Sequence, residues 1–343
     1  MRVLVTGGCG FLGSHVCEFY TRKGWDVVAY DSLTKYELAR TGYGSDAARS
    51  YNCDFLTRLG VRIVKADIRD ADVLLKNATG CNYIVHTAAQ PAMTISWEDP
   101  RLDITTNVLG TFNVLETARA LKIPMASCAT IHIYGNEINA ELTEGPTRYL
   151  RTPAAIDESY PLCRGKLSPL HASKVAGDYY VRTYIDQYGL EAASFRLTGL
   201  YGPRQFGGED HGWVANFAIR AVKGRPLRVF GTGKQLRDII YATDVCEAFH
   251  AFFEQRQPGV YNIGGSTMTA ISLLECIDLL GKITGRTLDV RMEPVRYGDL
   301  FYFVCDIAKA QRLLKWQPAV RPKEGVAKLV QWIQQEENLF VVR

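Results

Sequence analysis

Short apolar runs rich in Val, Ile and Ala alternate, in the first half of the chain, with longer segments in which apolar residues recur at helical spacing. This alternation is typical of parallel strands that are joined by crossover helices and covered on both faces. The pattern predicts strands at 2–6, 26–31, 61–67, 82–88, 124–129 and 191–197, and helices from about residue 10, over 107–121 and over 172–188. We therefore predict an α/β fold with a doubly wound parallel sheet.

After residue 197 the alternation of apolar runs and helical segments becomes less regular. The pattern predicts a loop at 201–212, a helix at 214–224, a hairpin-like region at 226–242 and another helix at 243–255. We expect residues 1–197 to form a dinucleotide-binding domain and residues 198–343 to form mainly a smaller α/β substrate-binding part. Segments 231–258 and 303–315 are expected to return to the first domain.

Composition narrows the classes of function. A net charge of +4 without a dense Lys/Arg run gives no nucleic-acid footprint, and no apolar stretch is long enough to span a bilayer. The N-terminus leads directly into a strand and a glycine turn, unlike a signal peptide. Nine cysteines without a CxxC pair fit a reducing compartment better than a disulfide framework. We expect a cytoplasmic protein with no nucleic-acid or membrane partner.

A glycine-rich turn, TGGCGFLG at 6–13, follows the first strand and opens a helix. Glycines permit a tight turn and a close approach of the backbone to a pyrophosphate, which the helix N-terminus attracts. Asp31 ends the second strand, where its carboxylate can accept hydrogen bonds from ribose hydroxyls and would repel a 2′-phosphate. Asp67 ends the third strand and could reach the adenine amine. The sequence thus favours NAD over NADP as cofactor.

Further segments occur in the order found in one known family: HTAAQ (86–90), NVLGTFNVLE (107–116), IYG (133–135), SK (173–174), LYGPR (200–204), GKQLRD (233–238), YNIGG (261–265) and RYGD (296–299). With them the chain resembles the extended short-chain dehydrogenase/reductase family, the NAD-dependent sugar epimerases and dehydratases. The resemblance implies a Rossmann domain, a nucleotide-sugar substrate and a homodimer or homotetramer. AAQPAMTIS (88–96) and YGPRQFGGEDHGWVANF (201–217) are most similar to the CDP-tyvelose (CDP-paratose) 2-epimerases. That similarity implies C2 epimerisation of a CDP-hexose through a transient keto sugar.

Enzymes of this family pass a hydride from a sugar carbon to NAD while a tyrosine takes the hydroxyl proton. A lysine four residues later and a Ser/Thr support that tyrosine. The resemblance assigns Lys174 to the lysine and Thr130, four residues before Tyr134, to the Ser/Thr. We place His171 at the tyrosine position.

Three interpretations of His171 stay open. An imidazole has an unperturbed pKa near ~6.5, so it could act as the base without help from a lysine. Alternatively, the replacement marks an impaired enzyme or an active-site variant, or the register is wrong and another tyrosine serves. Retention of the other motifs favours the working histidine, and a net oxidoreductase or decarboxylase is a further alternative.

The positions after Thr130 also depart from part of the family. Sugar 4,6-dehydratases carry Asp-Glu there, whereas this chain has Ile131 and His132. An isoleucine cannot protonate a leaving hydroxyl, so 4,6-dehydration is disfavoured. His132 remains a candidate proton shuttle or substrate contact, whereas Cys128 is expected to be a small buried thiol. The spacing of the histidines matches no metal motif, and we expect no metal site.

The resemblance implies two sets of binding residues. Two arginines resemble diphosphate clamps, because a guanidinium can bind phosphate oxygens in pairs. The substrate set is Met93, Asn107, Thr198, Gln205, Trp213, Arg237 and Arg296. The cofactor set is Gly7, Gly10, Phe11, Leu12, Gly13, Asp31, Ser32, Asp67, Ile68, Ala88, Ala89, Gln90, Lys174 and Arg196.

Overall fold

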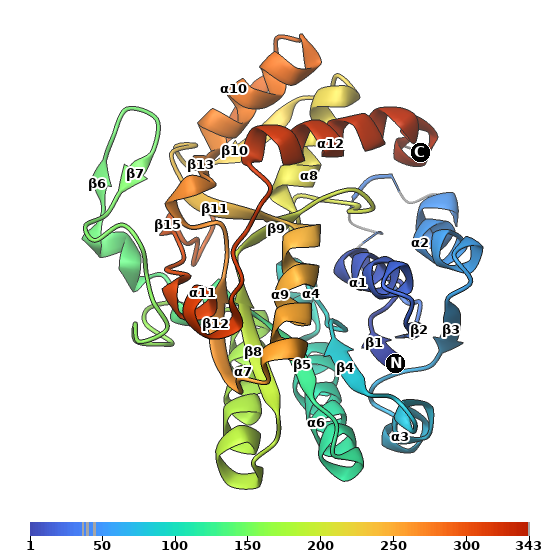
Figure 1. Ribbon diagram of the computed structural model, residues 1–343. Coiled ribbons are helices and arrows are strands. Elements are labelled where there is room, and N and C mark those ends of the chain that lie inside the picture. Colours follow the sequence, from blue (N-terminus) through green and yellow to red (C-terminus); the bar gives the residue numbers. More distant parts are fainter. Residues whose placement is uncertain (36–37, 39–40, 44–45, 342–343) are drawn as a thin grey trace.

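A seven-stranded parallel sheet forms the centre of the molecule (Figure 1). The computed structural model describes residues 1–35, 38, 41–43 and 46–341. The sheet order is β12-β8-β5-β4-β1-β2-β3. Its strands are β1 (Arg2–Thr6), β2 (Asp26–Asp31), β3 (Arg62–Lys65), β4 (Tyr83–His86), β5 (Met125–Thr130), β8 (Ala192–Leu197) and β12 (Gly259–Ile263). The predicted doubly wound α/β fold and six of these strands are confirmed.

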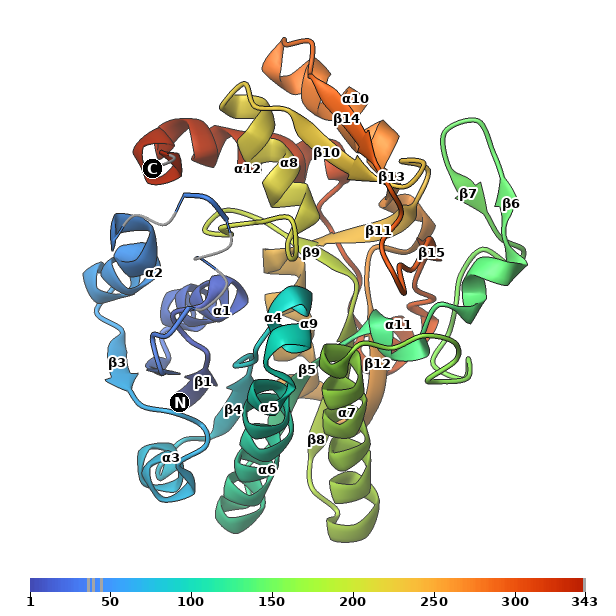
Figure 2. The same cartoon turned by 180° about the vertical axis from the view of Figure 1, so that it is seen from behind.

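Both faces of the sheet are covered by helices. Val3 and Val5 of β1 point into one core and Leu4 into the other, and all three are fully buried. One face carries α1 (Phe11–Arg22), α2 (Asp46–Arg58), α9 (Ala242–Gln255) and α11 (Ala308–Leu314). The other face carries α3 (Ala71–Ala78), α6 (Gly110–Leu121) and α7 (Pro169–Tyr188), of which α6 and α7 stand in front of the sheet in Figure 2. Burial on two sides explains why the strands read as continuous apolar runs.

The helices expected from periodicity lie where the pattern put them, including α8 (Trp213–Val222). A π-helical turn (Ile104–Leu109) precedes α6 and follows two short helices, α4 (Met93–Glu98) and α5 (Pro100–Asp103). No helix in the described ranges is long and apolar enough to cross a membrane.

A second, smaller layer caps the carboxyl edge of the sheet. Its core brings together α8, α10 (Leu273–Thr284) and α12 (Pro322–Gln335). Short strands flank these helices: β9 (Gly199–Tyr201), β10 (Leu227–Phe230), β11 (Leu236–Tyr241), β13 (Ala270–Ser272), β14 (Val290–Glu293) and β15 (Tyr302–Phe303). A separate hairpin of β6 (Thr143–Glu144) and β7 (Tyr149–Leu150) projects from the body in Figure 1.

Two sequence expectations need correction. Residues 226–242 do not form a hairpin: β10 pairs with β14, whereas β11 pairs with β9, β13 and β15. Strand β12, at the edge of the main sheet, was not predicted. Both errors concern partners that are distant in sequence, which local periodicity does not encode. The domain limits at 197 and 198 stay a prediction.

Candidate active site

A cleft of about 640 Å³ runs along the carboxyl edge of the sheet, between the sheet and the capping layer. It lies where the strand order reverses between β1 and β4, which is the usual ligand crevice of open α/β sheets. Most of the predicted residues line it: Gly7, Gly10, Phe11, Leu12, Asp31, Ser32, Asp67, Ile68, Ala88, Ala89, Gln90, Met93, Thr130, His132, His171, Lys174, Thr198, Gln205, Trp213, Arg237 and Arg296. Gly13, Asn107 and Arg196 are not in the lining.

The glycine turn forms one end of the cleft. Gly7 has φ +68°, and a Cβ there would lie 2.7 Å from the backbone of Ala88. A Cβ on Gly13 would lie 2.0 Å from the carbonyl oxygen of Gly7. Gly13 therefore lets the first turn of α1 pack onto the glycine turn. The result is a cradle of bare backbone at a helix N-terminus, which fits a pyrophosphate.

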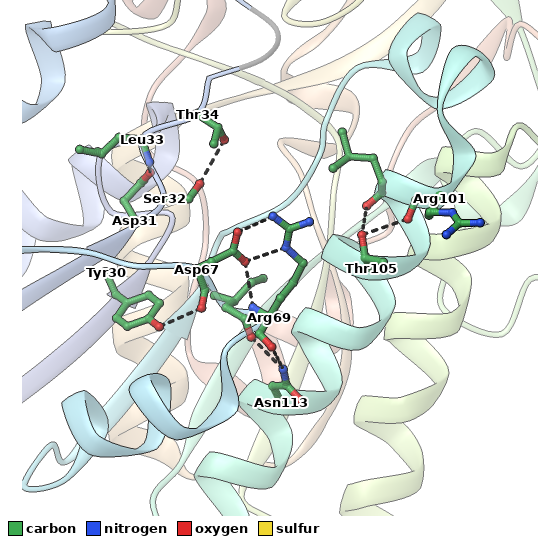
Figure 3. A network of polar contacts seen from close by, with 12 residues as sticks. Tyr30, Asp31, Ser32, Leu33, Thr34, Asp67, Arg69, Arg101, Thr105 and Asn113 are labelled. Carbon is green, nitrogen blue, oxygen red and sulfur yellow. Dashed lines mark hydrogen bonds and ion pairs between the residues drawn. The ribbon is translucent and has the colours of Figure 1, made fainter.

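Two carboxylates mark the neighbouring strands. Asp31 accepts hydrogen bonds from the backbone N–H of Cys9 at 2.9 Å and of Leu33 at 2.7 Å, which fixes it at the rim of the cleft. Asp67 forms an ion pair with Arg69 at 2.6 Å (Figure 3). Burial acts to raise the pKa of Asp67, but the hydrogen bonds and charge of Arg69 outweigh it and hold the pKa below its usual value. Both side chains keep acceptor oxygens for ribose or adenine donors.

Two imidazoles lie together in the middle of the cleft. The rings of His132 and His171 are parallel within 3°, with their centroids 4.8 Å apart. Thr130 ends β5, and its Oγ1 accepts from the backbone N–H of His132 at 3.3 Å. Burial lowers the pKa of His171 to about 4. Burial is the main cause that lowers the pKa of His132 well below its usual value, and electrostatic interactions with His171 and Arg237 lower it further. Both rings are therefore neutral at pH 7.

The assignment of His171 to the tyrosine position is wrong by one residue. The family tyrosine precedes the lysine by four residues, and the residue four positions before Lys174 is Leu170. Leu170 also lies on the first turn of α7, lines the cleft and is 8% exposed. An apolar side chain thus stands in place of the phenol, and His171 stands one position further along the helix.

The hydrogen bonds of His171 restrict its chemistry. His171 is the third residue of α7, and its Nδ1 accepts from the backbone N–H of Ser168 in a capping box, at 3.4 Å. The neutral ring then carries its hydrogen on Nε2. In this tautomer Nε2 donates a hydrogen bond. His171 can accept a proton only after it gives up the long contact with Ser168.

Lys174 lies one turn further along α7 and lines the cleft. Burial lowers its pKa, while Cys128 and Asp103 act in the opposite direction. Burial raises the pKa of Cys128 to about 12, so this side chain is a thiol at neutral pH. That protonation state does not suit a nucleophile.

The far end of the cleft is cationic. Arg237 is close to Asp299, and burial lowers the pKa of the guanidinium. Arg296 lies over the ring of Phe230 at 3.7 Å and donates to the carbonyl oxygen of Glu209 at 2.7 Å. Both guanidinium groups lower the pKa of Asp299, although burial raises it overall. Two arginines at one end of a cleft fit a diphosphate.

Two further polar side chains, an amide and an indole, line the same region. Gln205 donates from Nε2 to the carbonyl oxygen of Leu200 at 3.2 Å, and its buried Oε1 accepts no hydrogen bond from the described residues. Trp213 begins α8 and meets Phe217 edge to face. Both side chains line the cleft, and their role in substrate binding stays a prediction.

Two predicted binding residues have structural contacts instead. Asn107 is 2% exposed and engages Gln90, Asp103 and Ser173 through its amide. Arg196 forms a buried ion pair with Asp178 at 2.7 Å. Neither side chain lines the cleft, so the structure gives no support to their predicted contacts with substrate and cofactor, which stay predictions.

Other cleft residues were missed by the sequence reasoning: Leu170, Arg204, Phe230, Gln235 and Asp299. The quoted segments SK, LYGPR, GKQLRD and RYGD contain or lie near four of them, so these segments carried a usable signal. Phe230 gave none, because a lone aromatic residue in a strand is usually core.

Metal-type side chains do not converge in the described parts of the chain, where no group of three or more His, Cys, Asp or Glu could hold an ion. His86 bonds to Thr6 at 2.7 Å and to Thr111 at 3.0 Å, and burial lowers its pKa to about 3. These contacts make it a structural residue.

The fold and the cleft together define a dinucleotide-binding enzyme of the doubly wound class. Residues 3–264 match the NAD dependent epimerase/dehydratase family, and the chain belongs to that family. It is 33% identical to the CDP-paratose 2-epimerase of Salmonella typhi, over 97% of this chain and 99% of that one. It is 31% identical to the UDP-glucose 4-epimerase of Mycolicibacterium smegmatis, over 98% and 100% of the two chains.

Solved structures give the same result. The UDP-glucose 4-epimerase of Thermus thermophilus in complex with NAD superimposes with a TM-score of 0.80, at 31% identity over 98% of this chain and 100% of that one. The UDP-glucose 4-epimerase of Thermotoga maritima with UDP-glucose gives 0.81, at 27% identity over 98% and 99%. The expected family, fold class and NAD cofactor are confirmed, and the glycine cradle fits that cofactor.

Proposed function

We propose that the protein is an NAD-dependent epimerase of a nucleotide-activated hexose, and that it inverts C2 of CDP-paratose or CDP-tyvelose through a transient keto sugar. The observation that carries the proposal is a single cleft that joins the glycine cradle, a neutral imidazole pair and two arginines. The similarity to a CDP-paratose 2-epimerase over nearly both full lengths supports this choice of sugar.

Each part of the cleft then has a role. The glycine cradle and Asp31 bind the dinucleotide, which when bound accepts a hydride from a sugar carbon and returns it. Lys174 orients this cofactor, and Thr130 hydrogen-bonds the reacting oxygen. Nε2–H of His171 donates to the same oxygen. His132 accepts the proton that the sugar hydroxyl gives up, while His171 keeps its contact with Ser168. Arg237 and Arg296 bind the diphosphate.

The surroundings of the imidazole pair support a deoxygenated sugar. Ile131 and Leu170 adjoin His132 and His171 in the chain, and both line the cleft. A sugar carbon without a hydroxyl can lie against these apolar surfaces at no cost. A hydroxyl placed there would lose a hydrogen bond to water. A dideoxyhexose suits this lining better than a fully hydroxylated sugar.

Proton NMR of the purified protein with a panel of nucleotide sugars, and without added reductant, tests the proposal. The panel includes CDP-paratose, CDP-tyvelose and UDP-glucose. We expect the C2 epimer to form from either CDP sugar with no net NADH. Conversion of UDP-glucose alone would contradict the substrate class, and net NADH would favour the alternative of an oxidoreductase or decarboxylase.

A second candidate is an impaired NAD-binding homologue. Leu170 at the tyrosine position favours it, because a leucine exchanges no proton. Under this candidate no sugar in the panel changes, although NAD stays bound. Leu170→Tyr would then restore turnover, since it places a phenol one helical turn before Lys174.

We also propose a cytoplasmic homodimer or homotetramer. All nine cysteines are unpaired, which suits a reducing compartment. Apolar side chains on α6, α7 and the π-helical turn are exposed: Leu109 at 44%, Phe112 at 37%, Tyr180 at 42% and Tyr188 at 57%. An exposed cluster of this kind marks a protein interface. Light scattering on the purified protein measures the oligomeric state, and a monomer would contradict this part of the proposal.

A further inference from the structure

A buried carboxylate lies behind the cleft. Asp103 ends α5, immediately before the π-helical turn, and is 1% exposed. It does not line the cleft, and the roles proposed above do not use it. A fully buried acid is costly unless it is paired or hydrogen-bonded, so its contacts call for an explanation.

Amide donors surround the carboxylate of Asp103. Its Oδ1 accepts from Nε2 of Gln90 at 3.0 Å and from Nδ2 of Asn107 at 3.2 Å. Its Oδ2 is buried and accepts no hydrogen bond that meets the same geometry from the described residues. Burial raises the pKa of this carboxyl, while Ser96, Gln90 and Lys174 oppose the rise. The donors and Lys174 favour the ionised form, whereas burial, the largest effect, favours the neutral one.

The same contacts connect Asp103 to the start of α7. Asn107 donates from Nδ2 to Oγ of Ser173 at 3.0 Å. Ser96, which lies near Asp103, accepts from the backbone N–H of Leu170 at 2.6 Å. Two serines thus tie the helical turn that carries Lys174 to the elements around this carboxylate.

Lys174 needs a counter-charge. In the described ranges it forms no ion pair within 4 Å. Three titratable groups interact electrostatically with Lys174: Cys128 on β5, His86 on β4 and Asp103 on α5. His86 is neutral and Cys128 is a thiol at neutral pH, so Asp103 is the one negative charge among them. Asp99, four residues earlier in the chain, is exposed and acts on Asp103 itself.

We propose that Asp103 is a positioning residue that keeps Lys174 protonated and fixes the first turns of α7 against the segment carrying Gln90. It acts from outside the cleft through charge and hydrogen bonds. The proposal rests on the proposed function only for the role of Lys174 toward the cofactor.

The ionisation of Lys174 can be measured without substrate. Competitive labelling of the whole protein with acetic anhydride at a series of pH values, followed by mass spectrometry, gives the pH midpoint for this lysine. Asp103→Asn keeps the shape and an acceptor oxygen but removes the charge. We expect the midpoint of Lys174 to fall, because removing a nearby opposite charge makes the ammonium form less favourable.

Asp99→Asn is the matched control. Asp99 caps α5 through the N–H of Leu102, and asparagine caps a helix equally well. The control removes an exposed charge four residues away, and its Lys174 midpoint should stay close to that of the parent. An unchanged midpoint in Asp103→Asn, or an equal shift in both variants, would overturn the proposal.

If Asp103→Asn is too unstable for labelling, a double variant still tests the proposal. If Asp103→Asn lowers Tm because it leaves a cation without its counter-charge, adding Lys174→Met should recover part of the loss. Additive losses would overturn the proposal. Neither measurement depends on turnover, so a protein that converts no sugar would still test the role of Asp103.

Discussion

The most direct test of the neutral imidazole pair is the loss of folding stability at low pH that a buried, neutral His171 should cause. His171 is 8% exposed, and burial lowers its pKa to about 4, against about 6.5 in an unfolded chain. The unfolded chain therefore binds a proton between these two values that the folded protein does not. The free energy of unfolding must then fall as the pH falls through this window.

The size of the effect follows from the two pKa values. At pH 5 an unfolded histidine is about 1.5 units below its pKa, and each unit corresponds to roughly 1.4 kcal/mol. His171 should thus cost the fold about 2 kcal/mol at pH 5 and almost nothing at pH 7.5. Other buried groups titrate in the same range, some with the opposite sign, so the measurement compares the parent with a single variant.

His171→Gln is the suitable variant, because glutamine at the third helical position completes a capping box as histidine does here. Urea unfolding, followed by tryptophan fluorescence at several pH values from 7.5 to 5, gives the stability difference between the two proteins. We expect the variant to gain about 2 kcal/mol on the parent over this range. His250→Gln should gain less, because His250 pairs with Glu254. A difference that does not change with pH would refute a neutral, buried His171.

Three further outcomes are expected. Leu170→Tyr should not raise turnover if the imidazole pair works, and a gain of about 100-fold or more in kcat would show that the parent lacks a competent base. Arg237→Met should raise KM for the nucleotide sugar by roughly 10-fold to 100-fold with a smaller change in kcat, because charge-assisted hydrogen bonds to phosphate contribute about 1.5–3 kcal/mol. Gly13→Ala should lose NAD on purification, since its Cβ would fall 2.0 Å from the carbonyl oxygen of Gly7; absorbance of the released nucleotide measures this. Gly177→Ala, whose Cβ would meet nothing closer than 3.7 Å, is its control and should retain the cofactor.

The sheet domain and the cofactor end of the cleft could be predicted from the amino-acid sequence alone. Strands β1, β2, β4, β5 and β8 are apolar because helices cover both faces, and that burial is visible in composition alone. The glycine turn was equally readable, since its function depends on consecutive residues between one strand and one helix. Local patterns of this kind can be recognised in a single sequence.

Tertiary structure decided what each polar side chain touches. Asn107 and Arg196 were assigned to ligands because they stand in or near family segments, but both face buried partners. His132 and His171 come from β5 and α7 regions that only folding brings together. No spacing in the sequence indicates that these rings stack, or which nitrogen carries a hydrogen.

The off-by-one placement of His171 has a different cause, because the sequence itself places Leu170 four positions before Lys174. A motif match fixed Lys174, but which preceding side chain replaces the tyrosine depends on counting one helical turn back to Leu170. Asp103 was not singled out at all, since one acid in a short helix gives no periodic signal. Local order is set by residues a few positions apart and can be read from the chain. Contacts among Asp103, Lys174 and the imidazole pair depend on how separate elements pack, and only the folded structure specifies them.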